Sequence, residues 1–161
     1  MTRSEALYSP PDVEAAWGEW RCTCGPAATA AILGISCAEV RSLFPGHKER
    51  GGWANPTHVR KALEAAPVKF RVRPGVWPSR GLAFVQIEGP WCDPGVPVGA
   101  AYKRTHWVAC LGDLVWDIND GCWRLREAWE CTTLQRILLH HGAKATGWRV
   151  RTGIEVSDAG A

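Results

Sequence analysis

The stretch THWVACLGDLVWDIN, residues 105–119, has the alternation and the turn of a β-hairpin. Two runs of alternating residues flank a Gly-Asp connection, and glycine at its first position suits a type II′ turn. Pairing Leu111 with Leu114 sets the register, so that Cys110 faces Val115. We therefore expect an antiparallel sheet to include this hairpin.

One face of this hairpin combines apolar and polar side chains. The register places His106 opposite Asn119 and diagonal to Asp117 on the same face. The backbones of His106 and Asp117 are then roughly 7–8 Å apart, within reach of their side chains. The pair has a structural interpretation, as a satisfied polar pair at a sheet end, and a functional one, as a carboxylate that orients an imidazole. The other face is predicted to pack into the core through Trp107, Ala109, Leu111, Leu114, Trp116 and Ile118.

The stretch WRCTCGPAATAAILG, residues 20–34, predicts a buried helix that starts beside a cysteine. Pro26 suits the first turn of a helix, and Gly34 suits its end. Cys24 would then lie at the helix N-terminus, where the partial positive charge favours a thiolate. Cys22 and Cys24 without a second nearby pair fall short of the usual zinc patterns, so no metal or other cofactor is predicted.

The rest of the chain reads as helices first and sheet second. Ser36 and Asn55 can cap two further helices. The expected elements are helices over 37–44, 56–66 and 132–141, a turn-rich surface loop over 89–104, and strands over 68–73, 82–88 and 147–156. This order predicts a single α+β domain over residues 1–161, with a helical part at about 12–66 and a sheet part at about 67–156.

Composition and charge say little about partners. The 161 residues include 19 basic and 16 acidic side chains, a net charge of +3 that favours neither a nucleic-acid nor a membrane partner. The start of the chain lacks a signal-peptide pattern, and no segment approaches the roughly 20 apolar residues of a membrane span. We therefore expect a cytoplasmic protein whose seven cysteines are free thiols.

The remaining histidines are not predicted to belong to a functional site. His47 and His58 lie in or beside a glycine-rich segment, whereas His140 and His141 close an apolar helix, where cations interact favourably with the helix dipole. We interpret all four as structural or solvent-exposed.

The motifs CGPAA (residues 24–28) and HWVA (residues 106–109), followed by Asp117, resemble those of papain-like cysteine peptidases. The likeness is closest to the branch of bacteriocin-processing, or double-glycine leader, peptidases and runs from about Trp20 to Asn119. The stretches GGWANPTHVRKALEAA (residues 51–66) and HWVACLGDLVWDIN (residues 106–119) are also similar to small uncharacterised proteins of tailed phages and prophages. The resemblance implies a papain-like fold, with N-terminal helices packed on a C-terminal antiparallel sheet.

The resemblance also implies a role for each site residue. Cys24 would be the nucleophile, His106 the general base and later acid, and Asp117 the group that orients His106, with Asn119 as the alternative third member. The implied reaction is hydrolysis of an amide or peptide bond through a thioester, on a protein or peptide substrate.

One departure from the family pattern keeps other functions open. The family has an oxyanion-stabilising glutamine five or six residues before the cysteine, where this chain has Gly18 and Glu19. Trp20, Arg21 or Gln86 could replace it. If none of them does, the loss of one such donor costs roughly two to three orders of magnitude in rate. The alternatives are a weak or inactive papain-like phage protein that binds a host or virion protein, and transglutaminase- or deamidase-type acyl transfer with the same three residues.

Overall fold

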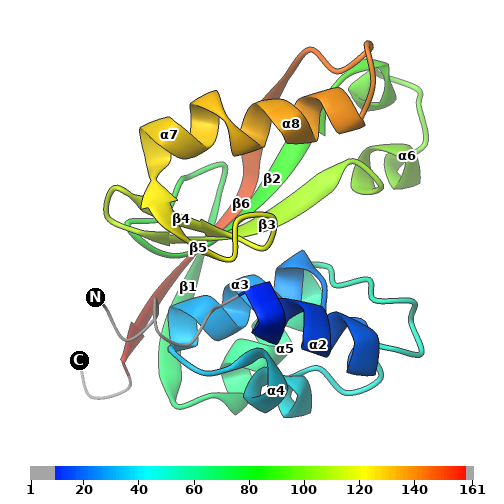
Figure 1. Ribbon diagram of the computed structural model, residues 1–161. Coiled ribbons are helices and arrows are strands. Elements are labelled where there is room, and N and C mark those ends of the chain that lie inside the picture. Colours follow the sequence, from blue (N-terminus) through cyan, green and yellow to red (C-terminus); the bar gives the residue numbers. More distant parts are fainter. Residues whose placement is uncertain (1–9, 159–161) are drawn as a thin grey trace.

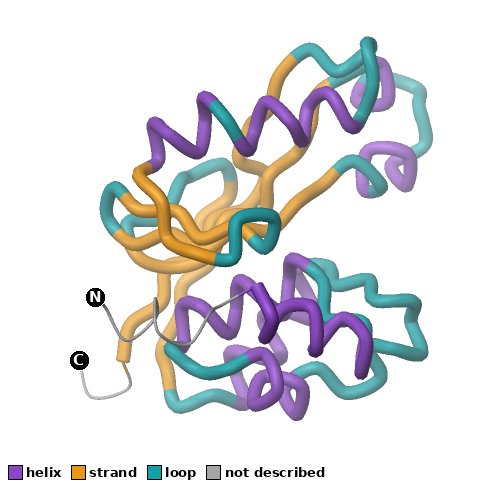
Figure 2. Tube along the Cα trace, viewed as in Figure 1, coloured by secondary structure: helices purple, strands orange, loops and turns teal. Residues whose placement is uncertain are grey.

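The computed structural model describes residues 10–158 and places one antiparallel sheet between two groups of helices (Figures 1 and 2). The predicted limits of the domain, residues 1–161, extend beyond the described residues. The sheet has the strand order β1-β6-β2-β3-β4-β5. Its strands are β1 (Val68–Pro74), β2 (Arg80–Glu88), β3 (Thr105–Leu111), β4 (Leu114–Asp117), β5 (Cys122–Leu125) and β6 (Gly147–Asp158). The α+β prediction is confirmed.

The helices on one side of the sheet all precede it in the chain. They are α2 (Pro10–Trp20), α3 (Cys24–Leu33), α4 (Cys37–Val40) with the short 3₁₀ helix η1 (Arg41–Leu43), and α5 (Pro56–Ala65). The caps act as predicted: Ser36 forms a capping box with Glu39, and Asn55 accepts a hydrogen bond from the His58 amide. Gly34 ends α3 in the left-handed conformation, with φ of 68°.

The central hairpin has the predicted register. Leu111 pairs with Leu114 and Cys110 with Val115. The expectation that the second strand runs to residue 119 is wrong, because β4 ends at Asp117. The Asp117 carbonyl accepts hydrogen bonds from the amides of residues 120 and 121, which turns the chain out of the sheet. His106 therefore has a strand partner on β2 but none on β4.

A second helical layer covers the other face of the sheet and was not predicted as such. It consists of α7 (Arg126–Cys131) and α8 (Thr133–His140), which follow β5 and lie across the sheet from α3 (Figure 1). The helix predicted over 132–141 corresponds to α8, whereas β5 and α7 lacked a clear pattern. Trp129 and Leu134 of this layer pack on Val108, Cys110 and Val115 of the hairpin. The sheet is therefore buried on both faces.

The segment between β2 and β3, predicted as a turn-rich surface loop, contains two short helices. Residues 89–104 contain the 3₁₀ helix η2 (Pro90–Cys92) and the short helix α6 (Val98–Tyr102). The buried amide of Gln86 donates to the carbonyls of Ala101 and Arg104 and holds the end of this segment at the sheet.

The start of α3 lies very close to β3. A Cβ atom added to Gly25 would lie 2.9 Å from the Cβ of Ala54 and 3.3 Å from Cδ1 of Trp107. Trp107 is itself fixed, since its indole nitrogen donates to the Ala54 carbonyl at 3.0 Å. The missing side chain at Gly25 therefore lets the helix bearing Cys24 pack directly against the strand bearing His106.

We predict that Gly25→Ala lowers the free energy of unfolding by about 1–3 kcal/mol, the usual cost of overpacking a tight contact. Gly18→Ala is the matched control, because a Cβ there meets nothing within 4 Å and alanine favours the helix α2 by about 0.5–1 kcal/mol. Urea unfolding of both variants measures the difference. Equal stabilities would show that the contact with Trp107 imposes no constraint.

Candidate active site

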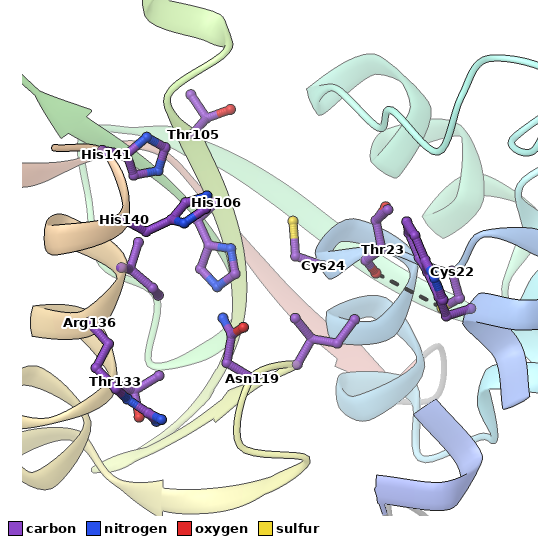
Figure 3. A pocket seen from close by; sticks show the side chains of 13 residues that line it. Cys22, Thr23, Cys24, Thr105, His106, Asn119, Thr133, Arg136, His140 and His141 are labelled. Carbon is purple, nitrogen blue, oxygen red and sulfur yellow. Dashed lines mark hydrogen bonds between the residues drawn. The ribbon is translucent and has the colours of Figure 1, made fainter. Parts of the chain in front are cut away.

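A cleft of about 530 Å³ opens beside Cys24, between the start of α3 and the helix α8 (Figure 3). It exists because β4 stops at Asp117, so that the first residues of β3 are not covered by a neighbouring strand on that side. The residues that line it are Trp17, Cys22, Thr23, Cys24, Thr105, His106, Ile118, Asn119, Thr133, Arg136, Ile137, His140 and His141.

His106 and Asp117 form a hydrogen-bonded ion pair at the floor of this cleft. Nε2 of His106 lies 2.8 Å from Oδ2 of Asp117. The His106 side chain is 12% exposed, whereas that of Asp117 is fully buried. The diagonal contact predicted from the hairpin register therefore exists.

Three further N–H groups hold the Asp117 carboxylate. Asn119 donates to Oδ1 from both its backbone amide and its side chain, each at 2.9 Å. The indole of Trp129 donates to Oδ2 at 2.9 Å. Asn119, expected as an alternative partner of His106, thus gives its hydrogen bonds to Asp117. Trp129 was not anticipated, because no local pattern links a tryptophan of α7 to a carboxylate twelve residues earlier.

The ionisation of this pair follows from its contacts. Burial alone would lower the pKa of His106, but the charges of Asp117 and Cys24, with hydrogen bonds to both, hold that pKa well above its ordinary value. Burial alone would raise the pKa of Asp117, but His106 and the donors from Asn119 and Trp129 lower it to about 2. The imidazolium–carboxylate form is therefore favoured near neutral pH.

Cys24 is the first residue of α3 and is half-buried at the edge of the cleft. Figure 3 shows its sulfur and the His106 ring within the same pocket. Since Asp117 occupies Nε2 of His106, Nδ1 is the ring nitrogen left for the cysteine. Thr23 makes no side-chain cap, so the first amides of the helix are left without that partner. The structure thus brings together Cys24, His106 and Asp117.

Cys22 differs from Cys24 in its surroundings. It is fully buried, and a hydrogen bond with Cys37, burial and the neighbouring thiols together raise the pKa of Cys22 strongly. A thiol held in this way stays protonated and unreactive. Cys22 is therefore a packed residue of the core.

The turn that precedes Cys24 is fixed by buried hydrogen bonds. Arg21 has a positive φ of 60°, which is uncommon for a residue other than glycine. His47, buried among Trp20 and Phe44, contacts the Arg21 carbonyl through Nε2 at 3.0 Å. Thr23 donates to the carbonyl of Gly52 at 2.7 Å. His47 is therefore structural, as interpreted, and the loop after η1 holds the turn that precedes Cys24.

The residues expected to replace the oxyanion glutamine contact other groups. Trp20 is buried against His47 and does not line the cleft. Gln86 is also buried; its amide nitrogen donates to three carbonyls and its oxygen accepts from Arg151. Arg21 stacks over the ring of Trp17 at 5.0 Å. Trp20 and Gln86 therefore cannot stabilise an oxyanion at Cys24 in this arrangement.

Several residues of the cleft were not expected there. Trp17 lines it from α2, and Arg136 from α8. His140 and His141 also line it, so their interpretation as merely structural or exposed residues missed their proximity to His106 (Figure 3). A sequence signal existed only in the position of both histidines at the end of an apolar helix.

Within residues 10–158, no three His, Cys, Asp or Glu side chains are grouped so that they could hold a metal ion. The same part of the chain contains no helix of the length and apolarity that crossing a bilayer requires. Comparison of the chain with protein-family models, curated proteins and solved structures finds no match.

We predict that Asp117→Asn destabilises the protein by an amount that depends on pH. The depressed pKa of Asp117 makes its contribution complete above its ordinary value of 3.8 and lost as the pH falls toward about 2. The raised pKa of His106 makes its contribution complete below 6.5 and lost as the pH rises through the folded value. Between pH 3.8 and pH 6.5, the free energy of unfolding of Asp117→Asn should be about 3 kcal/mol below that of wild type, the lower end of the cost of breaking a buried ion pair.

Urea unfolding from pH 2.5 to pH 9 measures this gap. Asp93→Asn, at an exposed carboxylate, is the control and should stay within about 0.5 kcal/mol of wild type throughout. A gap for Asp117→Asn that is independent of pH would contradict the ion pair.

Proposed function

We propose that the protein is a cysteine-dependent hydrolase that cleaves an amide or peptide bond through a thioester. The observation that carries the proposal is the 2.8 Å contact of His106 with the buried Asp117, in a cleft that also holds Cys24 at a helix N-terminus. Nucleophile, base and orienting carboxylate from three separate elements are the minimum set for this chemistry.

The reaction assigns a step to each group. The Cys24 thiolate attacks the carbonyl carbon, and the electrons of the C=O bond move to oxygen. Collapse of this intermediate expels the amine, which takes the proton from Nδ1 of His106, and leaves a thioester. His106 then removes a proton from water, whose oxygen attacks the thioester carbonyl carbon. The C–S bond breaks, which releases the acid and restores the Cys24 thiolate beside the protonated His106. Asp117 keeps the imidazole oriented throughout and stabilises its charge.

The oxyanion needs donors other than Trp20 and Gln86, which are buried and hold other contacts. The backbone amide of Cys24 is at the helix start, where the dipole favours negative charge. The indole N–H of Trp17 and the one side-chain amide hydrogen of Asn119 that is not given to Asp117 belong to side chains that line the same cleft. Together these groups are the candidates for the role that a glutamine has in the papain-like pattern.

A second candidate function is that of a papain-like phage protein with little or no catalysis that binds a host or virion protein. The burial of Trp20 and Gln86 favours this function, because neither residue can then replace the oxyanion-stabilising glutamine of the papain-like pattern. The two candidates differ in the reactivity of Cys24, because binding alone requires no activated thiol.

We predict that limiting iodoacetamide at pH 6.5 labels Cys24 at least tenfold faster than Cys92 or Cys131, although both of these are more exposed. A neighbouring imidazolium favours the thiolate, which is the reactive form. Mass spectrometry of the tryptic peptides measures all three rates in one sample. The two exposed thiols are internal references for ordinary reactivity.

His106→Gln tests the cause of this selectivity. This variant should lose the preferential labelling of Cys24, while the amide of the new glutamine still offers a donor to Asp117. His106→Ala, which leaves the carboxylate without a cationic partner, is the second variant if circular dichroism shows that it folds. Labelling that follows exposure in the wild type, or a preference for Cys24 that survives both changes, would reject the hydrolase and favour the binding protein.

A further inference from the structure

The cleft has one wall that the proposed chemistry does not use. This wall is formed by α8 and its end, which present Arg136, His140 and His141 across the cleft from Cys24 (Figure 3). All three side chains are basic, and none of the described residues that line the cleft is acidic. The wall therefore differs from the floor, where His106 is matched by a carboxylate.

Nearby carboxylates do not neutralise this wall at its surface. The Asp117 side chain is fully buried, and that of Asp120 is 2% exposed. Asp120 accepts hydrogen bonds from Thr133, pairs with Arg124 at 3.2 Å, and lies 3.6 Å from Arg136. One buried carboxylate is thus shared between two guanidinium groups, which leaves an excess of positive charge.

Arg136 is the member of the wall that is free to meet a ligand. Its side chain is 68% exposed, and a guanidinium has five N–H donors of which the contact with Asp120 uses few. His141 is tied to Arg104, with 3.3 Å between Nδ1 and Nη1, and burial together with neighbouring positive groups lowers the pKa of His141. At neutral pH the fixed positive charge of this wall therefore rests on Arg136.

Apolar surface lies beside this charge. Ile118, Ile137 of α8 and Trp17 of α2, which is 47% exposed, also line the cleft. An acidic side chain has both parts that such a site would bind, an apolar stem and a carboxylate. A guanidinium binds a carboxylate with two parallel hydrogen bonds.

We propose that Arg136 binds a carboxylate of the peptide that Cys24 attacks, so that the protein selects acidic peptides. This inference rests on the proposed hydrolase function and adds its substrate class. The carboxylate belongs either to an aspartate or glutamate side chain or to the peptide's C-terminus, since both present the same group to the guanidinium.

The charge of the cleft can be tested at Cys24 without a substrate. Iodoacetate and iodoacetamide alkylate the same sulfur but differ by one negative charge, so the ratio of their rates reports the local potential. Arg136→Gln should lower this ratio at low salt, because it removes one positive charge from the wall across the cleft from Cys24. High salt should reduce the difference between wild type and variant.

Arg124→Gln is the matched control. Arg124 shares Asp120 with Arg136 and is also exposed, but it does not line the cleft. In each variant the other arginine still pairs with Asp120, so both should fold. An unchanged ratio in Arg136→Gln, or an equal fall in both variants, would overturn the assignment. Failure of iodoacetamide to select Cys24 rejects the hydrolase instead, and the ratio can still be measured.

Fluorogenic peptides test the substrate class directly. Pairs that differ only by glutamate or glutamine at each position around the cleaved bond should show a preference for glutamate at one position, expressed mainly in KM. Arg136→Gln should abolish it, and Arg124→Gln should not. Free and amidated C-termini distinguish a terminal carboxylate from a side chain. Equal rates for all pairs in the wild type would overturn the proposal.

Discussion

The buried carboxylate of Asp117 is the constraint on which the site depends. A charge removed from water is tolerated only when other groups replace the lost hydration, and Asp117 has four such contacts, from His106, Trp129 and two groups of Asn119. These donors come from β3, from α7 and from the turn after β4. Satisfying one carboxylate therefore ties the central hairpin to the second helical layer and sets the orientation of the His106 ring.

The cleft is a consequence of where the strands stop. Because Asp117 turns the chain out of the sheet, β4 covers β3 only from Ala109 to Leu111. His106 is left at the rim, where α3 approaches from one side of the sheet and α8 from the other (Figure 1). The absent side chain at Gly25 then allows α3 to approach β3 closely enough for Cys24 to share this rim. A short strand and a glycine thus bring together the two helical layers at one site.

Local signals predicted much of this arrangement from the sequence. The capping residues, Gly34 and the hairpin register depend on neighbouring residues, and the diagonal of His106 and Asp117 follows from that register. The wall formed by α8 and the contact of Trp129 with Asp117 depend on how distant segments pack, which the local residue pattern does not predict. Asn119 was misplaced because its hydrogen bonds to the Asp117 side chain replace strand pairing, a competition that alternation alone does not reveal.

Cys22 and Cys24 are only two residues apart but have very different surroundings. Cys22 lies in the core beside Cys37, where its thiol is kept protonated, whereas Cys24 begins a helix and faces an imidazolium. The difference arises at the turn between them and α2, where Arg21 adopts a positive φ and its carbonyl is held by His47. Strained backbone persists only where surrounding contacts impose it. The buried histidine therefore supports the direction in which Cys24 enters the cleft, although its own side chain does not line that cleft.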